Sequence, residues 1–324
     1  MVVDKPLAQI IPSCSHCGAK AVVELAYASV DLCSDCFNRL FEKRVWKANR
    51  KFKMFTRGER VAVGVSGGKD SSALLFVLSK MAIQIGFEII PVLVDEGIHG
   101  YRNKARVCAE DLCKRLGLEL KVYSYKDAFG KSMDEIMKMR NAGKIEGKSC
   151  SFCGVMRRKC LEEAAIALNA SKIALGHNAD DIAQTFLMNF LRGEPQRNER
   201  FGVVTGGGEE VEGLIPRVRP LVFNTEKETA EYCVLNDLPF YLGECPYAVE
   251  AFRGEVKNFL NATEEKYPGT KFNLLHSFID SKQNAGAGNS RSLGVANAVK
   301  CSSCGSPSSS GLCKACEFKQ LLSD

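Results

Sequence analysis

The sequence predicts an α/β fold, a doubly wound parallel sheet covered by helices, with a small cysteine-rich module at each end of the chain. Three observations predict it. The middle of the 324-residue chain alternates short β-branched runs with amphipathic stretches. A glycine-rich turn joins the first of these runs to a helical one. Pairs of cysteines stand near both termini.

Composition limits the class of protein. Hydrophobic residues make up 45% of the chain and charged residues 25%, as in globular proteins. No window approaches the roughly 18 apolar residues of a membrane span, and Met1–Ile11 lacks the pattern of a signal peptide. The 15 cysteines are an odd number in a chain without an export signal. We therefore expect a cytoplasmic protein whose cysteines bind metal or react, instead of forming a disulfide framework.

The periodicity of the middle region predicts alternating elements. Apolar runs favour strands at Arg60–Val65, Glu88–Val94, Glu119–Tyr123 and Lys172–Leu175. Helices are expected over Ser72–Met81, along Ile182, Phe186 and Phe190, and from a capping box at Thr225 to about Leu235. A last strand, Phe240–Leu242, is expected to deliver Cys245. The boundaries that follow are a first module at 1–45, a core at 46–280, a linker at 281–297 and a second module at 298–324.

The glycine-rich turn has the composition of an anion site. Ser66-Gly67-Gly68-Lys69-Asp70-Ser71 lies between a strand and a helix, where backbone N–H groups and the helix dipole attract phosphate. It is not a Walker A loop, because it is one residue too short and has Asp70 where Ser or Thr binds magnesium. The alternative is an ordinary strand-to-helix turn.

Two further strand ends carry acidic residues. Asp95 follows the second strand, where the ribose or base of a nucleotide lies in open parallel sheets. Gly176-His-Asn-Ala-Asp-Asp181 follows the fourth, and of its two acids we favour Asp181 over Asp180 for a metal or nucleotide role. Helix capping is the alternative for each.

The terminal cysteines have the spacing of metal ligands. The first module holds Cys14, Cys17, Cys33 and Cys36, and the second holds Cys301, Cys304, Cys313 and Cys316. Four thiolates around Zn²⁺ make a closed structural site, so we predict one zinc ribbon at each end. A single iron in one module is the alternative.

A third pair, Cys150 and Cys153, lies in the core before an expected helix. A redox disulfide, cluster ligation and chance all remain open for it. Cys245 lies in a turn after an expected strand, a setting from which its thiolate can point into a functional site. Cys113, Cys160 and Cys233 lie among apolar residues and are predicted to be core cysteines.

Positive charge is concentrated in one segment. The segment Arg39–Arg60 contains nine basic residues and two acidic ones, while the rest of the chain is almost neutral in net charge. Arg39, Lys43 and Lys47 recur at helical spacing with Trp46 and Phe52 between them. This pattern suits an RNA backbone, and a solvated charged face is the alternative.

The motifs together resemble one family. Ser66–Ser71 resembles the pyrophosphatase loop of enzymes that adenylate a carbonyl oxygen and release pyrophosphate from ATP. With the terminal ribbons, the chain as a whole resembles the tRNA 2-thiouridine synthetases, whose core is adenine nucleotide alpha hydrolase-like. The resemblance rests on the segments Val94–Arg102, Cys150–Arg158, Gly176–Thr185, Leu191–Gly193, Ile215–Arg217 and Glu244–Tyr247.

The resemblance implies roles for the residues of the loop. Ser66, Gly67, Gly68 and Ser71 would hold pyrophosphate oxygens, Lys69 would offset their charge, and Asp70 would place Mg²⁺. Asp95, Gly176 and Asp181 would bind ATP, with Asp181 supporting catalysis. Arg157 would stabilise the negative charge of the adenylate, the alternatives being an RNA phosphate contact or simple solvation.

The resemblance also implies a 4Fe-4S cluster on Cys150, Cys153 and Cys245. Three protein thiolates leave one iron open, and that iron can bind sulfide. The alternative is a persulfide on Cys150 or Cys245 that the other cysteine resolves as a disulfide. His99 stands where the family usually has Lys, so its role stays open.

The function expected from the resemblance is ATP-dependent 2-thiolation of a tRNA uridine. We favour the wobble uridine, with a thymine-loop uridine as the alternative. The sulfur donor is sulfide or a ubiquitin-like carrier protein, and the family implies a homodimer. Two other classes remain, another adenylating synthetase and a non-catalytic zinc and RNA-binding module.

Overall fold

The computed structural model describes residues 12–206, 214–248, 252–287, 299–308 and 310–323. Its centre is a six-stranded sheet with the order β5-β4-β3-β6-β8-β7. The strands are β3 (Arg60–Gly64), β4 (Glu88–Asp95), β5 (Lys121–Ser124), β6 (Lys172–Ala174), β7 (Val204–Thr205) and β8 (Arg217–Val218). All neighbours pair in parallel except β7, which is antiparallel to β8. The predicted parallel α/β sheet is thus confirmed.

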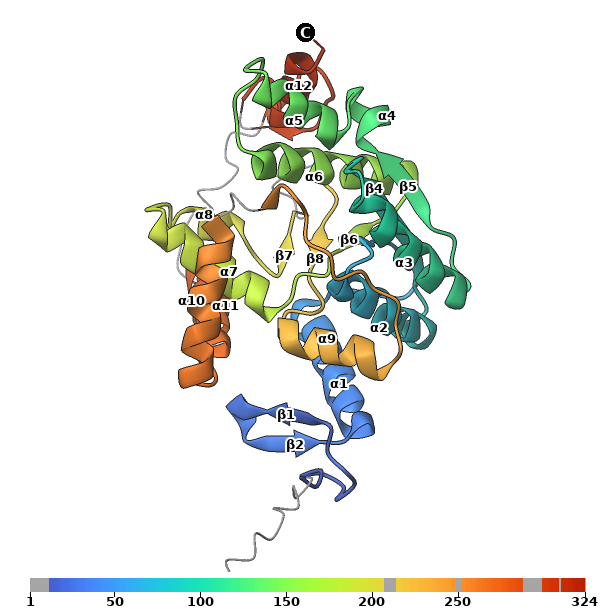
Figure 1. Cartoon of the computed structure of the whole chain (residues 1–324), viewed down its shortest axis with the longest axis vertical. Coiled ribbons are helices and arrows are strands. Elements are labelled where there is room, and N and C mark those ends of the chain that lie inside the picture. Colours follow the sequence, from blue (N-terminus) through green and yellow to red (C-terminus); the bar gives the residue numbers. More distant parts are fainter. Residues whose placement is uncertain (1–11, 207–213, 249–251, 288–298, 309, 324) are drawn as a thin grey trace, which may run out of the picture.

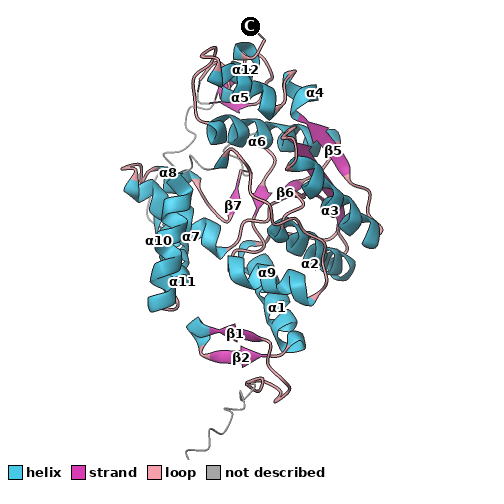
Figure 2. Ribbon diagram, viewed as in Figure 1, coloured by secondary structure: helices cyan, strands magenta, loops and turns pink. Residues whose placement is uncertain are grey.

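Helices cover both faces of this sheet (Figures 1 and 2). Along β3, Val61 and Val63 pack into one apolar cluster with α2 (Lys69–Ile85), while Ala62 packs into another with α6 (Ser149–Ala167). Successive side chains of a strand point to opposite faces, so a strand buried on both faces reads as a continuous apolar run. This is why Arg60–Val65 lacks the alternation of a half-exposed strand.

The remaining helices surround this core. They are α1 (Ser34–Phe52), α3 (Arg102–Arg115), α4 (Tyr125–Phe129), α5 (Met133–Asn141), α7 (Ala179–Leu191), α8 (Arg197–Arg200), α9 (Glu226–Leu235), α10 (Phe252–Lys266), α11 (Thr270–Ala287) and α12 (Lys314–Leu321). The capping box predicted at Thr225 is present at the start of α9. Within the described residues, no helix has both the length and the apolar character needed to cross a bilayer.

The two cysteine-rich modules lie at opposite ends of the molecule (Figure 1). The first contains the antiparallel strands β1 (Val23–Leu25) and β2 (Val30–Leu32), with the short 3-10 helix η1 (Ala26–Ala28) between them, and leads into α1. The second pairs β9 (Val299–Lys300) with β10 (Pro307–Ser308) and continues into α12. It docks on α6, where the rings of Phe318 and Phe152 lie 4.6 Å apart.

Three local expectations differ from the structure. Phe240–Leu242 forms no strand. The Tyr241 N–H donates to the Gly67 carbonyl of the glycine-rich loop (2.8 Å), so this segment is held by a loop and not by a neighbouring strand. The pair Cys150 and Cys153 lies inside the first turns of α6 and not before it. The expected linker begins within α11, which continues to Ala287, and its remaining positions 288–297 lie outside the described residues.

Candidate functional site

The glycine-rich loop connects β3 to α2 and is held by its own side chains. Ser71 Oγ accepts a hydrogen bond from the Ser66 N–H (3.0 Å) and donates to the Gly68 carbonyl (2.9 Å). Gly67 has φ +82°, and a Cβ there would stand 1.8 Å from the carbonyl oxygen of Ala105 on α3. The position therefore requires glycine. The loop places backbone N–H groups at the start of a long helix, a site suited to phosphate.

Lys69 and Asp70 form the first turn of that helix. The Lys69 ammonium contacts Asp70 Oδ2 (3.1 Å) and Glu226 Oε1 (2.9 Å). Burial alone would lower the pKa of Lys69, but the two carboxylates raise it above its ordinary value. Lys69 is therefore cationic at neutral pH.

Asp70 and Asp181 are joined through one buried amide. Asn178 Nδ2 donates to Asp70 Oδ1 (3.0 Å), and Asn178 Oδ1 accepts from the Asp181 N–H (3.1 Å). Arg253 Nη1 donates to Asp181 Oδ1 (2.9 Å). Burial raises the pKa of both carboxyls, and the charge of Asp181 raises that of Asp70 further. Two neighbouring carboxylates beside a phosphate loop are the donor set that Mg²⁺ prefers.

Asp180 serves a different purpose from its neighbour. Its carboxylate accepts hydrogen bonds from the Lys271 ammonium and from the Glu226 N–H (2.8 Å), and it is buried. These contacts tie α7, α9 and α11 together. Asp180 thus lies within the scaffold, while Asp181 lines the cavity described below.

Gly176 and His177 follow β6 and lie beside the loop. A Cβ on Gly176 would lie 3.0 Å from the Asp70 carbonyl, so the absence of a side chain lets the segment after β6 approach the first turn of α2. The imidazole of His177 lines the same cavity. Burial and the charges of Arg219 and Arg253 lower its pKa to about 3, so it is neutral at physiological pH.

The core cysteine pair lies on α6, close to the loop of Cys245. Cys153 Sγ accepts hydrogen bonds from Arg157 Nη2 (3.0 Å) and Tyr125 Oη (3.4 Å). Ser149 Oγ, beside Cys150, donates to the Tyr247 carbonyl (2.9 Å) and joins the start of α6 to the Cys245 loop. Burial raises the pKa of the Cys245 thiol, and the charge of Cys153 raises it further.

The donor set of Cys150, Cys153 and Cys245 fits an iron–sulfur cluster in chemistry and placement. The three thiols come from two contacting segments, and Arg157 offers positive charge to the sulfur of Cys153. Within the described residues, these three thiols do not form a group whose sulfurs all lie within 4.8 Å of one another, unlike the terminal cysteines. Each cysteine of a cubane binds a different iron, so cluster ligands stand further apart than four ligands of a single ion.

A buried carboxylate that the sequence analysis did not single out links these parts. Glu96, at 1% exposure, contacts Arg157 Nη2 (2.9 Å) and forms an ion pair with the buried Arg102. Arg102 donates in turn to the Ser66 carbonyl (2.8 Å). One chain of contacts therefore runs from the phosphate loop to Cys153. The only signal in the sequence was an acidic residue next to Asp95 at a strand end.

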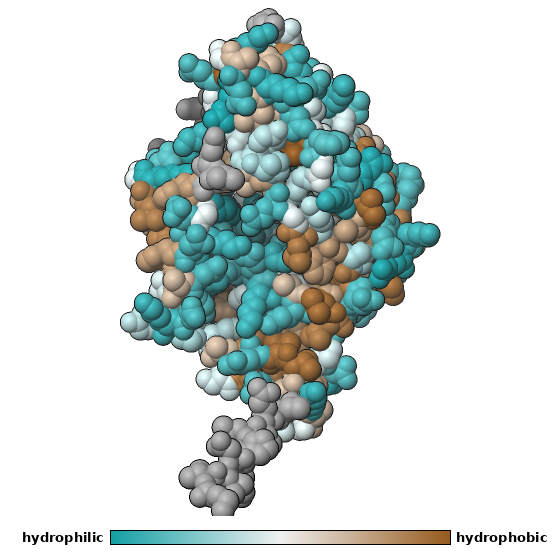
Figure 3. Space-filling view, in the orientation of Figure 1, coloured by the Kyte–Doolittle hydropathy of each residue, from teal (hydrophilic) through white to brown (hydrophobic). Residues whose placement is uncertain are grey.

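These groups surround one cavity of about 1410 Å³. Of the predicted residues, Ser66, Asp70, Ser71, Arg157, Gly176 and Asp181 line it. Nine of its lining residues are basic and four acidic: Arg102, Arg157, Arg158, Arg197, Arg200, Arg217, Arg219, Arg253 and Lys282, against Asp70, Glu96, Asp181 and Glu199. The cavity therefore favours an anionic ligand. The middle of the face in Figure 3 is largely hydrophilic.

Other predicted residues lie around the cavity without lining it. Gly67 and Gly68 belong to the loop and Lys69 starts α2, but none of them lines the cavity, and neither do Cys150, Cys153 and Cys245. Asp95 accepts a hydrogen bond from the Gly97 N–H (2.8 Å) and lies 4.0 Å from Arg106. In this structure it shapes the turn after β4.

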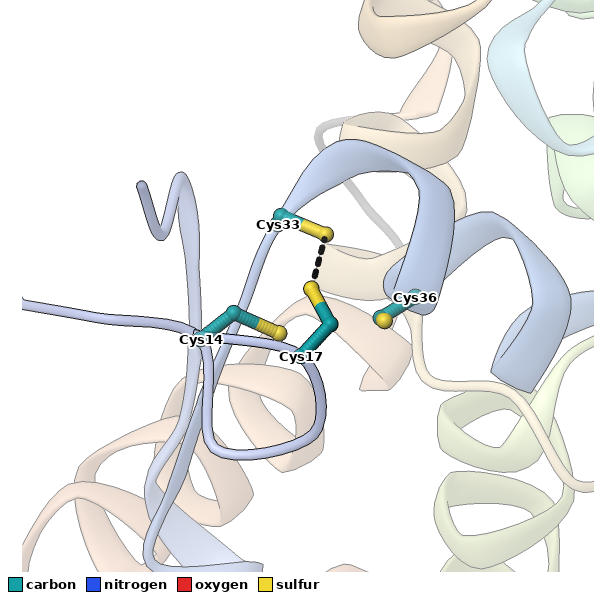
Figure 4. Close-up of side chains that lie close together, drawn as sticks. All are labelled: Cys14, Cys17, Cys33 and Cys36. Carbon is teal, nitrogen blue, oxygen red and sulfur yellow. Dashed lines mark hydrogen bonds between the residues drawn. The ribbon is translucent and has the colours of Figure 1, made fainter. Parts of the chain in front are cut away.

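Each terminal module brings four thiols together. The sulfurs of Cys14, Cys17, Cys33 and Cys36 lie within 4.8 Å of one another and converge in Figure 4. Those of Cys301, Cys304, Cys313 and Cys316 also lie within 4.8 Å of one another. Hydrogen bonds from the backbone N–H groups of Cys33 and Cys313 lower the pKa of Cys14 and Cys301 to about 6. Four sulfurs at this spacing fit a zinc ribbon.

Four cysteines lie outside these sites, and one of them, Cys108 on α3, is partly exposed. Cys113, Cys160 and Cys233 are buried, which confirms the prediction that they belong to the core. Burial raises their pKa to about 11, 12 and 12 respectively. They remain thiols at neutral pH.

The basic segment forms most of α1. Arg39, Lys43 and Lys47 are exposed on it, as expected of a binding stripe. Trp46 and Phe52, predicted to lie between the charges, pack instead against the apolar core. The reason is that the same helix must bury its other side, so these two aromatic residues contribute to the packing of the core.

Comparisons with known proteins agree with this geometry. A family model described as a PP-loop domain matches residues 40–263. The "Cytoplasmic tRNA 2-thiolation protein 1" of Danio rerio is 37% identical over 318 residues, covering 95% of this chain and 88% of its own. The "Probable sulfurtransferase" of Methanocaldococcus jannaschii is 33% identical, covering 93% and 86%.

A solved structure is similar along the whole chain. The U34-tRNA thiolase NcsA of Methanococcus maripaludis, determined with its [4Fe-4S] cluster, superposes with a TM-score of 0.80 at 28% identity. The match covers 96% of each chain.

Proposed function

The chain belongs to the PP-loop family and, within it, to the tRNA 2-thiolation enzymes, and from this premise we propose that it thiolates the wobble uridine of tRNA at C2. The observation that carries the proposal is that the phosphate loop, two carboxylates and the arginine beside Cys153 line the same cavity. The name of the M. maripaludis thiolase gives U34, the wobble uridine, as the nucleotide it acts on, and this supports our choice of the wobble position.

ATP would bind with its phosphates on the loop. The N–H groups around Gly67 and Gly68 hold pyrophosphate oxygens, and Lys69 offsets their charge. Asp70 and Asp181 would hold Mg²⁺. In the structure Lys69 is shared between Asp70 and Glu226, so phosphate binding would exchange one carboxylate partner for a phosphate oxygen.

Adenylation activates the uridine. The C2 oxygen attacks the α-phosphorus of ATP, the bond to the β-phosphate oxygen breaks, and pyrophosphate leaves. Arg157 would offset charge on the adenylate; in support, its side chain lines the cavity, is half exposed and contacts Glu96. Sulfide then attacks C2, AMP departs with the former C2 oxygen, and 2-thiouridine remains. The protein acts by positioning reactants and charge.

Cys150, Cys153 and Cys245 would hold a 4Fe-4S cluster. When bound, such a cluster supplies an iron with an open coordination position for sulfide. The protein contributes the three thiolates and the contact from Arg157 to Cys153 Sγ. The sulfur itself comes from free sulfide or from a ubiquitin-like carrier protein.

The remaining proposed assignments concern the scaffold and its partners. Zn²⁺ would fill each four-cysteine group, and the exposed side of α1 would contact the tRNA backbone. From the names of its relatives we infer a cytoplasmic enzyme. We also propose that it acts as a homodimer.

The test uses anaerobically purified protein with reconstituted metal. It is incubated with ATP, Mg²⁺, sulfide and unmodified tRNA, and the nucleosides are mapped by nuclease digestion and mass spectrometry. We expect 2-thiouridine at the wobble position. Thiolation in the thymine loop would overturn the choice of uridine but keep the reaction.

A cysteine variant tests the assignment of the cluster ligands. Cys245→Ser, folded and zinc-loaded, should lose iron and thiolation together. Cys113→Ser, which changes a core cysteine, is the matched control. If Cys245→Ser held four irons per chain and thiolated tRNA at the normal rate, the cluster ligands would be assigned wrongly.

A further inference from the structure

Three arginines gather on the α6 side of the cavity. Arg158 lies on α6, and Arg217 and Arg219 lie at β8, two residues apart and so on one face of the sheet. One carboxylate contacts them directly, Glu162 at 3.2 Å from Arg217 Nη2. Among the described residues, no hydrogen bond or ion pair is found for the guanidinium of Arg158.

The cluster has donors without acceptors. Arg219 is 93% buried, with 7% exposure, and although Nη1 donates to the Gly202 carbonyl (2.5 Å), its Nε is buried without a partner. The Nε of Arg217 is also buried without a partner. A buried charged donor left unpaired is costly, so native structures usually provide a partner for it.

The charges also oppose one another. Burial and the charge of Arg217 lower the pKa of Arg219 to about 10, with Asp181 acting in the opposite direction. Burial, Arg217 and Arg157 lower the pKa of Arg158. A positive cluster of this kind is stabilised when an anion enters.

The cluster is separate from the phosphate loop. The helix of the loop, α2, packs on one face of the sheet, whereas α6 packs on the other. The cavity of about 1410 Å³ also exceeds the range of roughly 300–1,000 Å³ typical of a site for one small ligand. The space extends beyond a single nucleotide.

We propose that Arg158, Arg217 and Arg219 form a second phosphate site, which holds a phosphate of a nucleotide ligand opposite the phosphate loop. The phosphate comes either from the RNA backbone next to the acceptor uridine or from the α-phosphate of ATP. The inference rests on the proposed function, since that function supplies both ligands. Guanidinium groups suit this task because their N–H groups pair with phosphate oxygens in a fixed geometry.

Arg158→Gln tests the site with little risk to folding, since the side chain lines the cavity and, within the described part of the chain, has no hydrogen-bond or ion-pair partner to lose. Arg115→Gln, which removes an exposed arginine outside the cavity, is the matched control. The binding of unmodified tRNA is measured by fluorescence anisotropy at several salt concentrations. The binding of a non-hydrolysable ATP analogue is measured separately by calorimetry.

An RNA phosphate at the site predicts that Arg158→Gln weakens tRNA binding about tenfold and lowers the salt slope by about 1, with unchanged binding of the analogue. An ATP phosphate predicts about tenfold weaker binding of the analogue and unchanged tRNA binding. Arg158→Lys should recover part of either loss. If Arg158→Gln matches Arg115→Gln with both ligands, the site is refuted. If the wild-type protein itself binds neither ligand, the proposed function fails instead.

Discussion

Glu96→Gln probes the chain of contacts between the phosphate loop and Cys153. The carboxylate is 1% exposed and pairs with Arg102, itself 3% exposed, and with Arg157. A neutral amide of the same shape leaves the buried Arg102 without its counter-charge, a change that costs about 3–5 kcal/mol. With 324 residues and an unfolding entropy of about 2.1 cal/mol/K per residue, this corresponds to a Tm lower by roughly 4–7 °C.

The assay is differential scanning calorimetry of the metal-loaded protein under anaerobic conditions. Glu88→Gln is the control, because Glu88 pairs with Arg60 at the surface and an exposed pair contributes less than about 1 kcal/mol. We expect Glu96→Gln to unfold several degrees below both the control and the wild type. Equal Tm values for Glu96→Gln and Glu88→Gln would refute the argument that this carboxylate holds the two arginines.

Three further predictions follow. Burial raises the pKa of Glu231 from 4.5 to about 7, so the folded state binds more protons than the unfolded state in this range, and stability falls as pH rises from about 4.5 through 7. Glu231→Gln should remove this fall and raise the Tm at pH 8; an unchanged pH profile of the Tm would contradict it. Gly67→Ala should abolish ATP binding in calorimetry, since its Cβ would collide with a carbonyl oxygen of α3, and normal affinity would contradict that geometry. Replacing Arg39, Lys43 and Lys47 together by Gln should lower the salt slope of tRNA binding by about 3 and leave ATP binding unchanged; an unchanged slope would exclude the exposed side of α1 from the interface.

Local signals in the sequence were sufficient for the sheet and the phosphate loop. The strands β3 and β4 are continuous apolar runs, and the capping box at Thr225 lies three residues from Glu228, so each depends on neighbours in the chain. The two groups of terminal cysteines could also be predicted from the sequence, because each module contains two closely spaced cysteine pairs that come together.

Contacts between residues far apart in the sequence could not be predicted. Glu96 lies 61 residues from Arg157 in the sequence, and nothing local shows that the two side chains meet. The same reason explains why Phe240–Leu242 was expected to form a strand, since its backbone is held by the loop at Gly67 and not by a neighbouring strand. The packing of the Trp46 side chain against the core likewise depends on which side of α1 faces the rest of the protein, and this is set by tertiary contacts.

Adenylation of the C2 oxygen is the central claim, and an oxygen label tests it most directly. Unmodified tRNA carrying ¹⁸O at C2 of its wobble uridine is converted by the metal-loaded enzyme with ATP, Mg²⁺ and sulfide, and the released AMP is analysed by mass spectrometry. The mechanism predicts one ¹⁸O in AMP for each 2-thiouridine formed and none in pyrophosphate. Formation of 2-thiouridine with the label in pyrophosphate or water would contradict it.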